Sequence, residues 1–85
     1  MSYGLIFGRQ AKKEIKTLDT SIIKRIEVRL QQLSNNPFDP RISKAIKMSP
    51  GRRTSRVGDW RIIYQMNETE RLIEVVSLWP RGKAY

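Results

Sequence analysis

The sequence predicts one α+β domain in which an N-terminal strand and a helical hairpin pack on a small antiparallel sheet. Apolar residues recur at helical spacing before position 35 and alternate with polar residues after position 53. A cluster of Asn, Asp and Pro residues at 35–40 separates the two patterns. Because 85 residues provide one modest core and no second one, we expect residues 1–85 to form a single domain with the order β-α-α-β-β-β.

The first part of the chain is predicted to hold one short strand and two amphipathic helices. Residues 3–7 alternate loosely in polarity, which indicates a strand. Apolar residues then follow helical spacing over 7–18, with basic residues on the other side. Residues 19–21 are all helix-capping types, and behind them a second apolar stripe begins and ends near Ser34.

The second part of the chain is predicted to form three antiparallel strands joined by tight turns. The runs of alternating polarity are 54–57, 60–66 and 71–79. Residues 41–51 show no period, so we assign them no regular structure. Because Pro80 cannot extend a central strand, the last five residues are expected to form a short tail.

Charge and residue usage restrict the partners and the chemistry. Lys and Arg number 17 against 8 Asp and Glu, and the formal charge of +9 favours a polyanion, either nucleic acid or an acidic protein. The chain has neither Cys nor His, which excludes disulfides, thiolate or imidazole metal ligands and a His base. It also lacks a run resembling an export signal or a membrane span. We therefore expect a cytoplasmic protein that does not act at a membrane and needs no metal or cofactor.

The turn at Gly58 and Asp59 is expected to bring two arginines together. If these two residues form the turn, Arg56 lies directly opposite Arg61 on the same side of the sheet. Like charges in directly opposed positions destabilise a sheet by roughly 0.2–1 kcal/mol. A fold with no use for an anion at this place gains nothing from such a pair.

The same alternation predicts which face of the sheet the helices cover. That face is expected to carry Trp60, Ile62, Tyr64, Met66, Ile73, Val75 and Trp79. Arg61, Gln65 and Glu74 fall on the opposite face. The sheet is therefore predicted to have a packed side and a charged side, and packing is favoured over base stacking for both tryptophans.

The basic excess is concentrated around this hairpin. Between positions 41 and 61 the only acidic residue is Asp59, whereas the basic residues are Arg41, Lys44, Lys47, Arg52, Arg53, Arg56 and Arg61. The forked donors of clustered Arg suit phosphate better than scattered Lys. The alternative is that Arg56 and Arg61 are solvated sheet residues that point apart. The basic face of the first helix is interpreted as a solubility feature or a general attraction for RNA.

Two segments resemble the RelE branch of the RelE/ParE toxin superfamily. The first is RVGDWRIIYQM at 56–66, with Arg56, Gly58, Asp59, Arg61 and Tyr64 as its marked positions. The second is the tail PRGKAY at 80–85. The order of elements agrees with that family over nearly the whole chain, so the resemblance implies a RelE-like fold.

The resemblance implies a toxin of a type II toxin–antitoxin system that acts as a ribosome-dependent endoribonuclease and cleaves mRNA in the A site. Arg61 would stabilise the scissile phosphate, Arg81 would neutralise or protonate the leaving oxygen, and Tyr85 would stack on or orient the nucleotide. Further contacts to RNA or phosphate are expected from Arg52, Arg53, Arg56, Lys83, Lys44 and Lys47. The chain departs from the family at Thr54, where a basic residue is frequent, and at Pro80. Either another arginine has taken over the basic role, or this chain cleaves more weakly than its relatives in the family.

The mechanism expected from this resemblance is attack by the ribose 2′-hydroxyl on the adjacent phosphate, without metal. Arg is a poor base because its pKa lies above about 12. The base stays open between a lysine, Tyr85, Glu74 and a group on the ribosomal RNA.

The expected partners are the ribosome with its 16S rRNA at the decoding site, mRNA, and a cognate antitoxin that binds the monomeric toxin in a heterocomplex. Two alternatives remain at this point. One is a ParE-like toxin that traps DNA gyrase and cuts nothing, and the other is a non-catalytic module that binds RNA or the ribosome.

Overall fold

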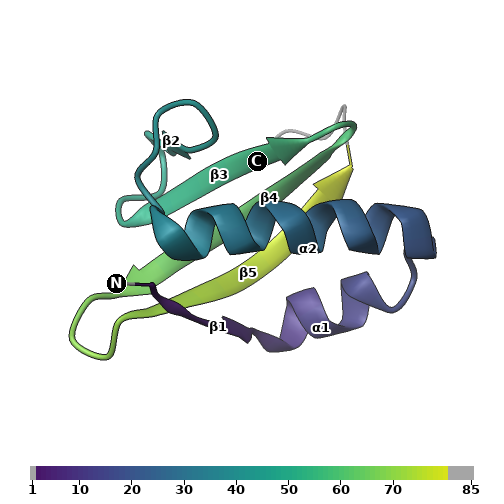
Figure 1. Cartoon of the computed structure of the whole chain (residues 1–85), viewed down its shortest axis with the longest axis horizontal. Coiled ribbons are helices and arrows are strands. Elements are labelled where there is room, and N and C mark those ends of the chain that lie inside the picture. Colours follow the sequence, from purple (N-terminus) through teal and green to yellow (C-terminus); the bar gives the residue numbers. More distant parts are fainter. Residues whose placement is uncertain (1, 81–85) are drawn as a thin grey trace.

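The structure, a computed structural model, describes residues 2–80, in which two helices accompany a five-stranded sheet (Figure 1). The elements are β1 (Gly4–Phe7), α1 (Arg9–Ile15), α2 (Thr20–Asn35), β2 (Lys44–Ala45), β3 (Arg52–Val57), β4 (Trp60–Asn67) and β5 (Leu72–Pro80). The strands lie in the order β1-β5-β4-β3-β2. The predicted α+β class and the order strand, helix, helix, strands are confirmed.

The sheet differs from the prediction in two ways. It is mixed rather than purely antiparallel, because β1 pairs with β5 in parallel while the other pairs are antiparallel. The segment that showed no period contains β2, which pairs Lys44 with Thr54 and Ala45 with Arg53. Two residues are too few for alternation to be visible, and polarity alone does not tell which strand a terminal segment will join.

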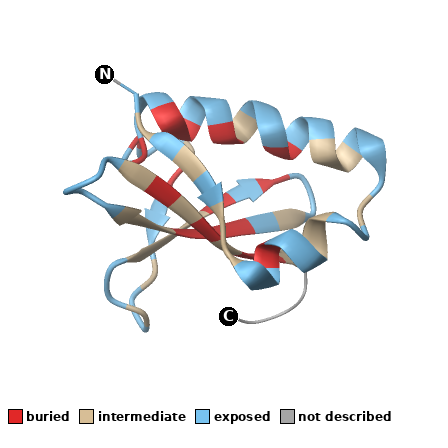
Figure 2. Ribbon diagram, turned by 90° about the horizontal axis from the view of Figure 1, so that it is seen from below, coloured by how far each residue is buried: buried red, intermediate tan, exposed pale blue. Residues whose placement is uncertain are grey.

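Helix α2 covers one face of the sheet. Figure 2 shows α2 lying across the strands with its buried residues turned toward them. These residues include Ile26, Leu30 and Leu33, which recur at helical spacing and are almost fully buried. Burial of each such side chain contributes roughly 1.5–3 kcal/mol. Neither of the two helices within residues 2–80 has the length and apolar character needed to cross a lipid bilayer.

Strand β5 contains a bulge that changes its alternation. Ile63 pairs with Ser77 and the next residue of β4, Tyr64, pairs with Val75, so Val76 is an extra residue in β5. One extra residue turns all the following side chains to the other face, because the side-chain period of a strand is two. Odd-numbered residues such as Ile73 and Val75 therefore face α2 before the bulge, and the even-numbered Leu78 faces it after the bulge.

The bulge corrects the prediction for one tryptophan. Trp79 was expected to face the helices, but it pairs with Arg61 and so lies on the opposite face. Leu78, which pairs with Ile62, takes its place in the core. The prediction for Trp60 is confirmed, because this residue packs against the core cluster.

Helix α1 lies at the edge of β5, beyond the end of β1. The last pair between β1 and β5 joins Phe7 to Val75. Past this point the Glu14 carboxylate of α1 accepts a hydrogen bond from the Leu78 amide at 2.8 Å and one from the Ser77 hydroxyl at 3.2 Å. Glu14 thus satisfies an edge amide for which a neighbouring strand is missing and holds the end of β5 in place.

The Tyr64 phenol ties the loop before β2 to the sheet. Tyr64 is fully buried and its hydroxyl donates to the Pro37 carbonyl at 2.6 Å. Its hydrogen is used there, so the Ser43 hydroxyl donates to the same phenol oxygen, and Arg53 Nε in turn donates to Ser43 at 2.7 Å. Burial raises the pKa of Tyr64, so the phenol stays protonated and keeps its donor.

Tyr64→Phe is expected to lower the free energy of unfolding by about 1–3 kcal/mol, because the Pro37 carbonyl is left without its donor. Urea unfolding monitored by circular dichroism measures this loss. Tyr3→Phe is the matched control, since the Tyr3 hydroxyl donates to Glu68 at 2.7 Å in an exposed position. A loss in the control equal to that in Tyr64→Phe would contradict this explanation.

Candidate functional site

The hairpin between β3 and β4 has the predicted register. Gly58 has a positive φ of 58° and Asp59 does not, a pattern typical of a two-residue type II′ turn. Val57 pairs with Trp60 and Arg56 pairs with Arg61. Both arginines are exposed and share the face opposite α2. The expected pair of directly opposed like charges is therefore present.

A cleft of about 470 Å³ opens beside this hairpin, where β2 stops covering the edge of β3. Five of the residues that line the cleft are cationic: Arg29, Arg41, Lys44, Arg56 and Arg61. None of the lining residues within 2–80 is acidic. Guanidinium groups keep their charge throughout the physiological pH range and offer several N–H donors, so this cleft is suited to an anion.

The structure brings only some of the predicted site residues together. Lys44, Arg56 and Arg61 line the cleft. Arg52 lies on the same face of the sheet but opposite Gln65, away from the hairpin tip. Lys47 is exposed in the turn between β2 and β3 and does not line the cleft. Three residues expected in the site, Arg81, Lys83 and Tyr85, lie outside the described residues.

Arg53 points to the other face of the sheet, apart from the cleft. Its guanidinium lies 5.2 Å from the centre of the Phe38 ring, and its Nε donates to Ser43. Alternation along β3 places Arg53 opposite Tyr64 on the face that α2 covers. The observed contacts of Arg53 therefore serve the loop before β2.

Two arginines of α2 reach the hairpin that were not predicted from the sequence. Arg29 Nη1 donates to the Arg56 carbonyl at 2.6 Å. Arg25 lies over the turn, so close that a Cβ atom at Gly58 would be 2.7 Å from its Nη2. The only signal in the sequence is their spacing of one helical turn on the polar face of α2, and it does not tell which part of the sheet that face approaches.

Arg41 is partly neutralised by a carboxylate outside the cleft. Its Nη2 donates to Asp39 Oδ2 at 2.8 Å and its Nε donates to Asp39 Oδ1 at 3.1 Å. These bonds lower the pKa of Asp39 to about 2, so the carboxylate stays charged. The attraction for an anion therefore comes mainly from the other four cations of the cleft.

The cleft offers donors and positive charge rather than a base or a metal site. Thr54 lines it, and its hydroxyl oxygen is buried without a hydrogen-bond partner among the described residues. Because this oxygen is buried, the hydroxyl adds no donor to the accessible surface of the cleft in this structure. Within residues 2–80, no three Asp or Glu side chains come close enough together to hold a metal ion.

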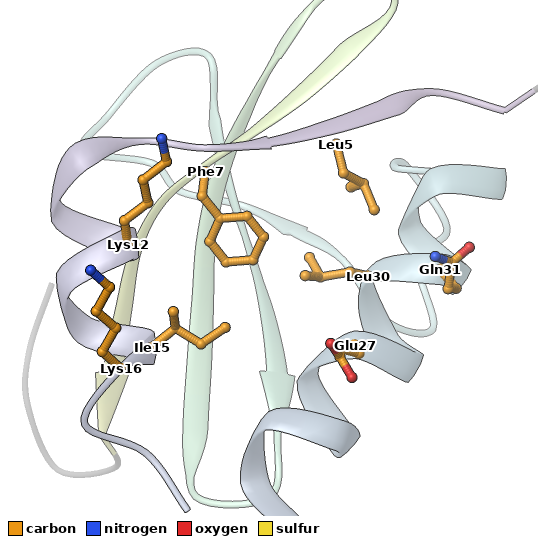
Figure 3. A pocket seen from close by; sticks show the side chains of 8 residues that line it. All are labelled: Leu5, Phe7, Lys12, Ile15, Lys16, Glu27, Leu30 and Gln31. Carbon is orange, nitrogen blue, oxygen red and sulfur yellow. The ribbon is translucent and has the colours of Figure 1, made fainter. Parts of the chain in front are cut away.

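A second surface lies at the opposite edge of the sheet. An apolar groove of about 640 Å³ runs between β1, α1 and α2, and Figure 3 shows Leu5, Phe7, Ile15 and Leu30 around it. Lys12 of α1 and Lys16, which directly follows α1, stand on one side of the groove, and Glu27 and Gln31 of α2 stand on the other. Because β1 and β2 are the two outer strands, the groove and the basic cleft are separate sites.

One protein family matches nearly the whole chain. The model of one family matches residues 5–85 and is described as the ParE toxin of the type II toxin–antitoxin system parDE. No curated protein matched the chain.

Solved structures of RelE toxins share the fold. A chain of the archaeal RelE–RelB complex from Pyrococcus horikoshii OT3 is 24% identical with a TM-score of 0.81, over 99% of this chain and 100% of that chain. The isolated E. coli RelE toxin is 18% identical with a TM-score of 0.83, over 98% and 88%. A chain of the RelB–RelE complex from Methanococcus jannaschii is 22% identical with a TM-score of 0.71, over 88% of each chain.

Gly58→Ala and Gly51→Ala are each expected to lower the free energy of unfolding by about 1–2 kcal/mol, because both glycines have a positive φ. At Gly58 the new methyl group also displaces the Arg25 guanidinium, whereas at Gly51 nothing lies within 4 Å. In an Arg25→Ala background the loss at Gly58 should therefore shrink and the loss at Gly51 should not change. Urea unfolding of the six proteins tests this, and equal losses at Gly58 in both backgrounds would exclude the contact.

Proposed function

Because the chain belongs to the RelE/ParE superfamily of type II toxins, we propose that it is a ribosome-dependent endoribonuclease that cleaves mRNA and thereby stops translation and growth. The observation that carries the proposal is the basic cleft. Arg29, Lys44, Arg56 and Arg61 converge there, and none of the described lining residues is acidic. Such a site binds a phosphate of a polyanion and stabilises additional negative charge on it.

The proposed reaction uses the nucleophile that RNA itself carries. The ribose 2′-oxygen forms a bond to the adjacent phosphorus, and the bond from phosphorus to the 5′-oxygen of the next nucleotide breaks. The products are a 2′,3′-cyclic phosphate and a free 5′-hydroxyl. Arg61, with Arg56 opposite it, neutralises the charge that develops on the phosphorane. In this proposal Arg81 assists the leaving 5′-oxygen and Tyr85 stacks on or orients the nucleotide.

The composition of the cleft supports a requirement for the ribosome. Among the described residues that line it there is no carboxylate or imidazole to remove the 2′-proton, and Arg is too weak a base. The base is therefore a lysine such as Lys44, a group of the tail or a group on the 16S rRNA at the decoding site, and alignment of the RNA must come from outside the cleft. Free RNA would be attracted to this surface without being aligned for in-line attack.

A gyrase poison is the second candidate function, because the family model that matches residues 5–85 is described as that of the ParE toxin. The two candidates leave different traces in cells after brief induction. Breaks inside translated codons, mapped by primer extension, support the ribonuclease. DNA damage without such breaks supports the gyrase poison, and growth arrest with neither supports a module that only binds RNA or the ribosome.

Arg61→Ala is expected to reduce cleavage by about 100-fold or more, because it removes a charge that acts on the transition state. Arg61 is exposed, so the fold should be retained. Primer extension on a translated message gives the rate of cleavage, and circular dichroism monitors the fold. Arg9→Ala removes the same charge from an exposed position on α1 and should leave cleavage unchanged. Undiminished cleavage by folded Arg61→Ala protein would refute the role of this residue.

The proposed regulator is a cognate antitoxin that binds the monomeric toxin in the cytoplasm. Among the solved structures with this fold are complexes of RelE with RelB. The groove between β1, α1 and α2 is suited to an amphipathic segment, since Leu5, Phe7 and Ile15 offer it an apolar floor. Lys12 and Lys16 beside this floor favour acidic residues on the same segment. We therefore expect the antitoxin to place an acidic amphipathic segment in the groove.

The double variant Lys12→Glu, Lys16→Glu is expected to weaken antitoxin binding about tenfold or more, because the new carboxylates repel the acidic residues expected on the antitoxin segment. Isothermal titration calorimetry measures the affinity. The double variant Lys13→Glu, Lys24→Glu makes the same charge change at exposed positions that do not line the groove and serves as the control. Equal weakening in both variants would mean that net charge rather than the groove decides binding.

A further inference from the structure

We propose that Arg29 of α2 is a positioning residue, which holds the edge of β3 so that Arg56 and Arg61 keep the spacing that one phosphate requires. The inference rests on the proposed function in one respect, the phosphate at the hairpin arginines. It assigns a role to a helix residue in a site otherwise lined by β strands and the loop before β2. The proposed function counts Arg29 only as one of the positive charges of the cleft and gives it no role in positioning.

The part of β3 that carries Arg56 has a strand on one side only. Pairing with β2 ends at Thr54, whereas pairing with β4 continues to Val57. Edge strands present unpaired backbone groups and are less constrained than central strands. The Arg56 carbonyl is such a group, and the guanidinium of Arg29 takes the place of the missing strand by donating to it at 2.6 Å.

Arg29 is itself held by other contacts in a fixed orientation. Its Nη1 also donates to the Ser55 hydroxyl at 3.0 Å, and its Nε donates to Gln32 Oε1 at 2.9 Å. Ser55 is buried on the face that α2 covers and does not line the cleft. The guanidinium therefore connects α2 to two successive residues of β3.

The need for such a connection follows from the charges. Arg56 and Arg61 repel each other across the strands when no anion lies between them. At the tip, the one hydrogen-bond acceptor of Arg56 Nε within residues 2–80 is the Gly58 carbonyl, at 3.3 Å. Without Arg29, nothing among the described contacts joins the Arg56 backbone to α2, and the edge is free to move away from the cleft. Preorganised donors stabilise a developing charge because they need not be rearranged during the reaction.

Arg29→Lys separates positioning from charge. Lysine keeps the positive charge in the cleft but has a single ammonium group, which cannot reproduce the planar fork that serves Nε and Nη1 acceptors together. Ser55→Ala is the complementary variant. It removes an acceptor of Arg29 and alters no group that faces the cleft.

The test titrates inorganic phosphate into the full chain and follows the amide resonances of Gly58 and Arg61 by NMR. Arg29→Lys should weaken phosphate binding about fivefold, and Ser55→Ala should weaken it in the same direction. The double variant should be no weaker than Arg29→Lys alone, because both changes interrupt one connection. Arg9→Lys, on exposed α1, is the control and should bind phosphate as the unaltered chain does.

A second readout is ribosome-dependent cleavage. For a positioning residue, kcat should fall about tenfold in Arg29→Lys while KM stays within about twofold. Phosphate affinity equal to that of the unaltered chain in Arg29→Lys overturns the inference, and so does an effect of Arg29→Lys that is absent in Ser55→Ala. A rise in KM alone also overturns it, since Arg29 would then contact RNA directly. If the unaltered chain binds phosphate but cleaves no message, the proposed function fails while the phosphate titration still decides the role of Arg29.

Discussion

The pairing of Arg56 with Arg61 is the constraint on which the candidate site depends. Gly58 at the turn sets the register, and a slip by one residue would move Arg56 to the face that α2 covers. Directly opposed like charges are unfavourable in an empty sheet, and a bound anion turns the same arrangement into an attraction. The short β2 leaves this part of β3 uncovered, so the anion has access from the side as well as from the face.

A structural feature can be predicted from the sequence when residues close to it in the chain determine it. The hairpin register follows from two turn residues and the polarity of their neighbours, and it was confirmed. The bulge at Val76 carries no Gly or Pro to mark it, so the position of Trp79 was wrong. Arg29 was missed because its role depends on how α2 crosses the sheet, which no period in the sequence records. Arg53 was placed with the phosphate ligands, although the alternation along β3 puts it on the side of Tyr64.

Two surfaces of the chain carry cationic side chains but differ in all other respects. The cleft beside β3 is polar and cationic, whereas the groove beside β1 is apolar with two lysines at its side. They lie at opposite edges of the sheet, so a segment in the groove does not by itself cover Arg61. An antitoxin that uses the groove must therefore reach farther round the molecule to block RNA. A partly disordered acidic chain is able to do so because it folds as it binds.

In the proposed ribonuclease reaction, the cleft and the ribosome have different roles because of what guanidinium groups can do. They hold a phosphate and stabilise added charge, but they neither remove the 2′-proton nor force the attacking and leaving oxygens into line. A site of this kind gains rate only when another body aligns the substrate. Under the proposed function, dependence on the ribosome follows from the residues of the cleft, and it would prevent a surface that attracts all RNA from cleaving other RNA in the cell.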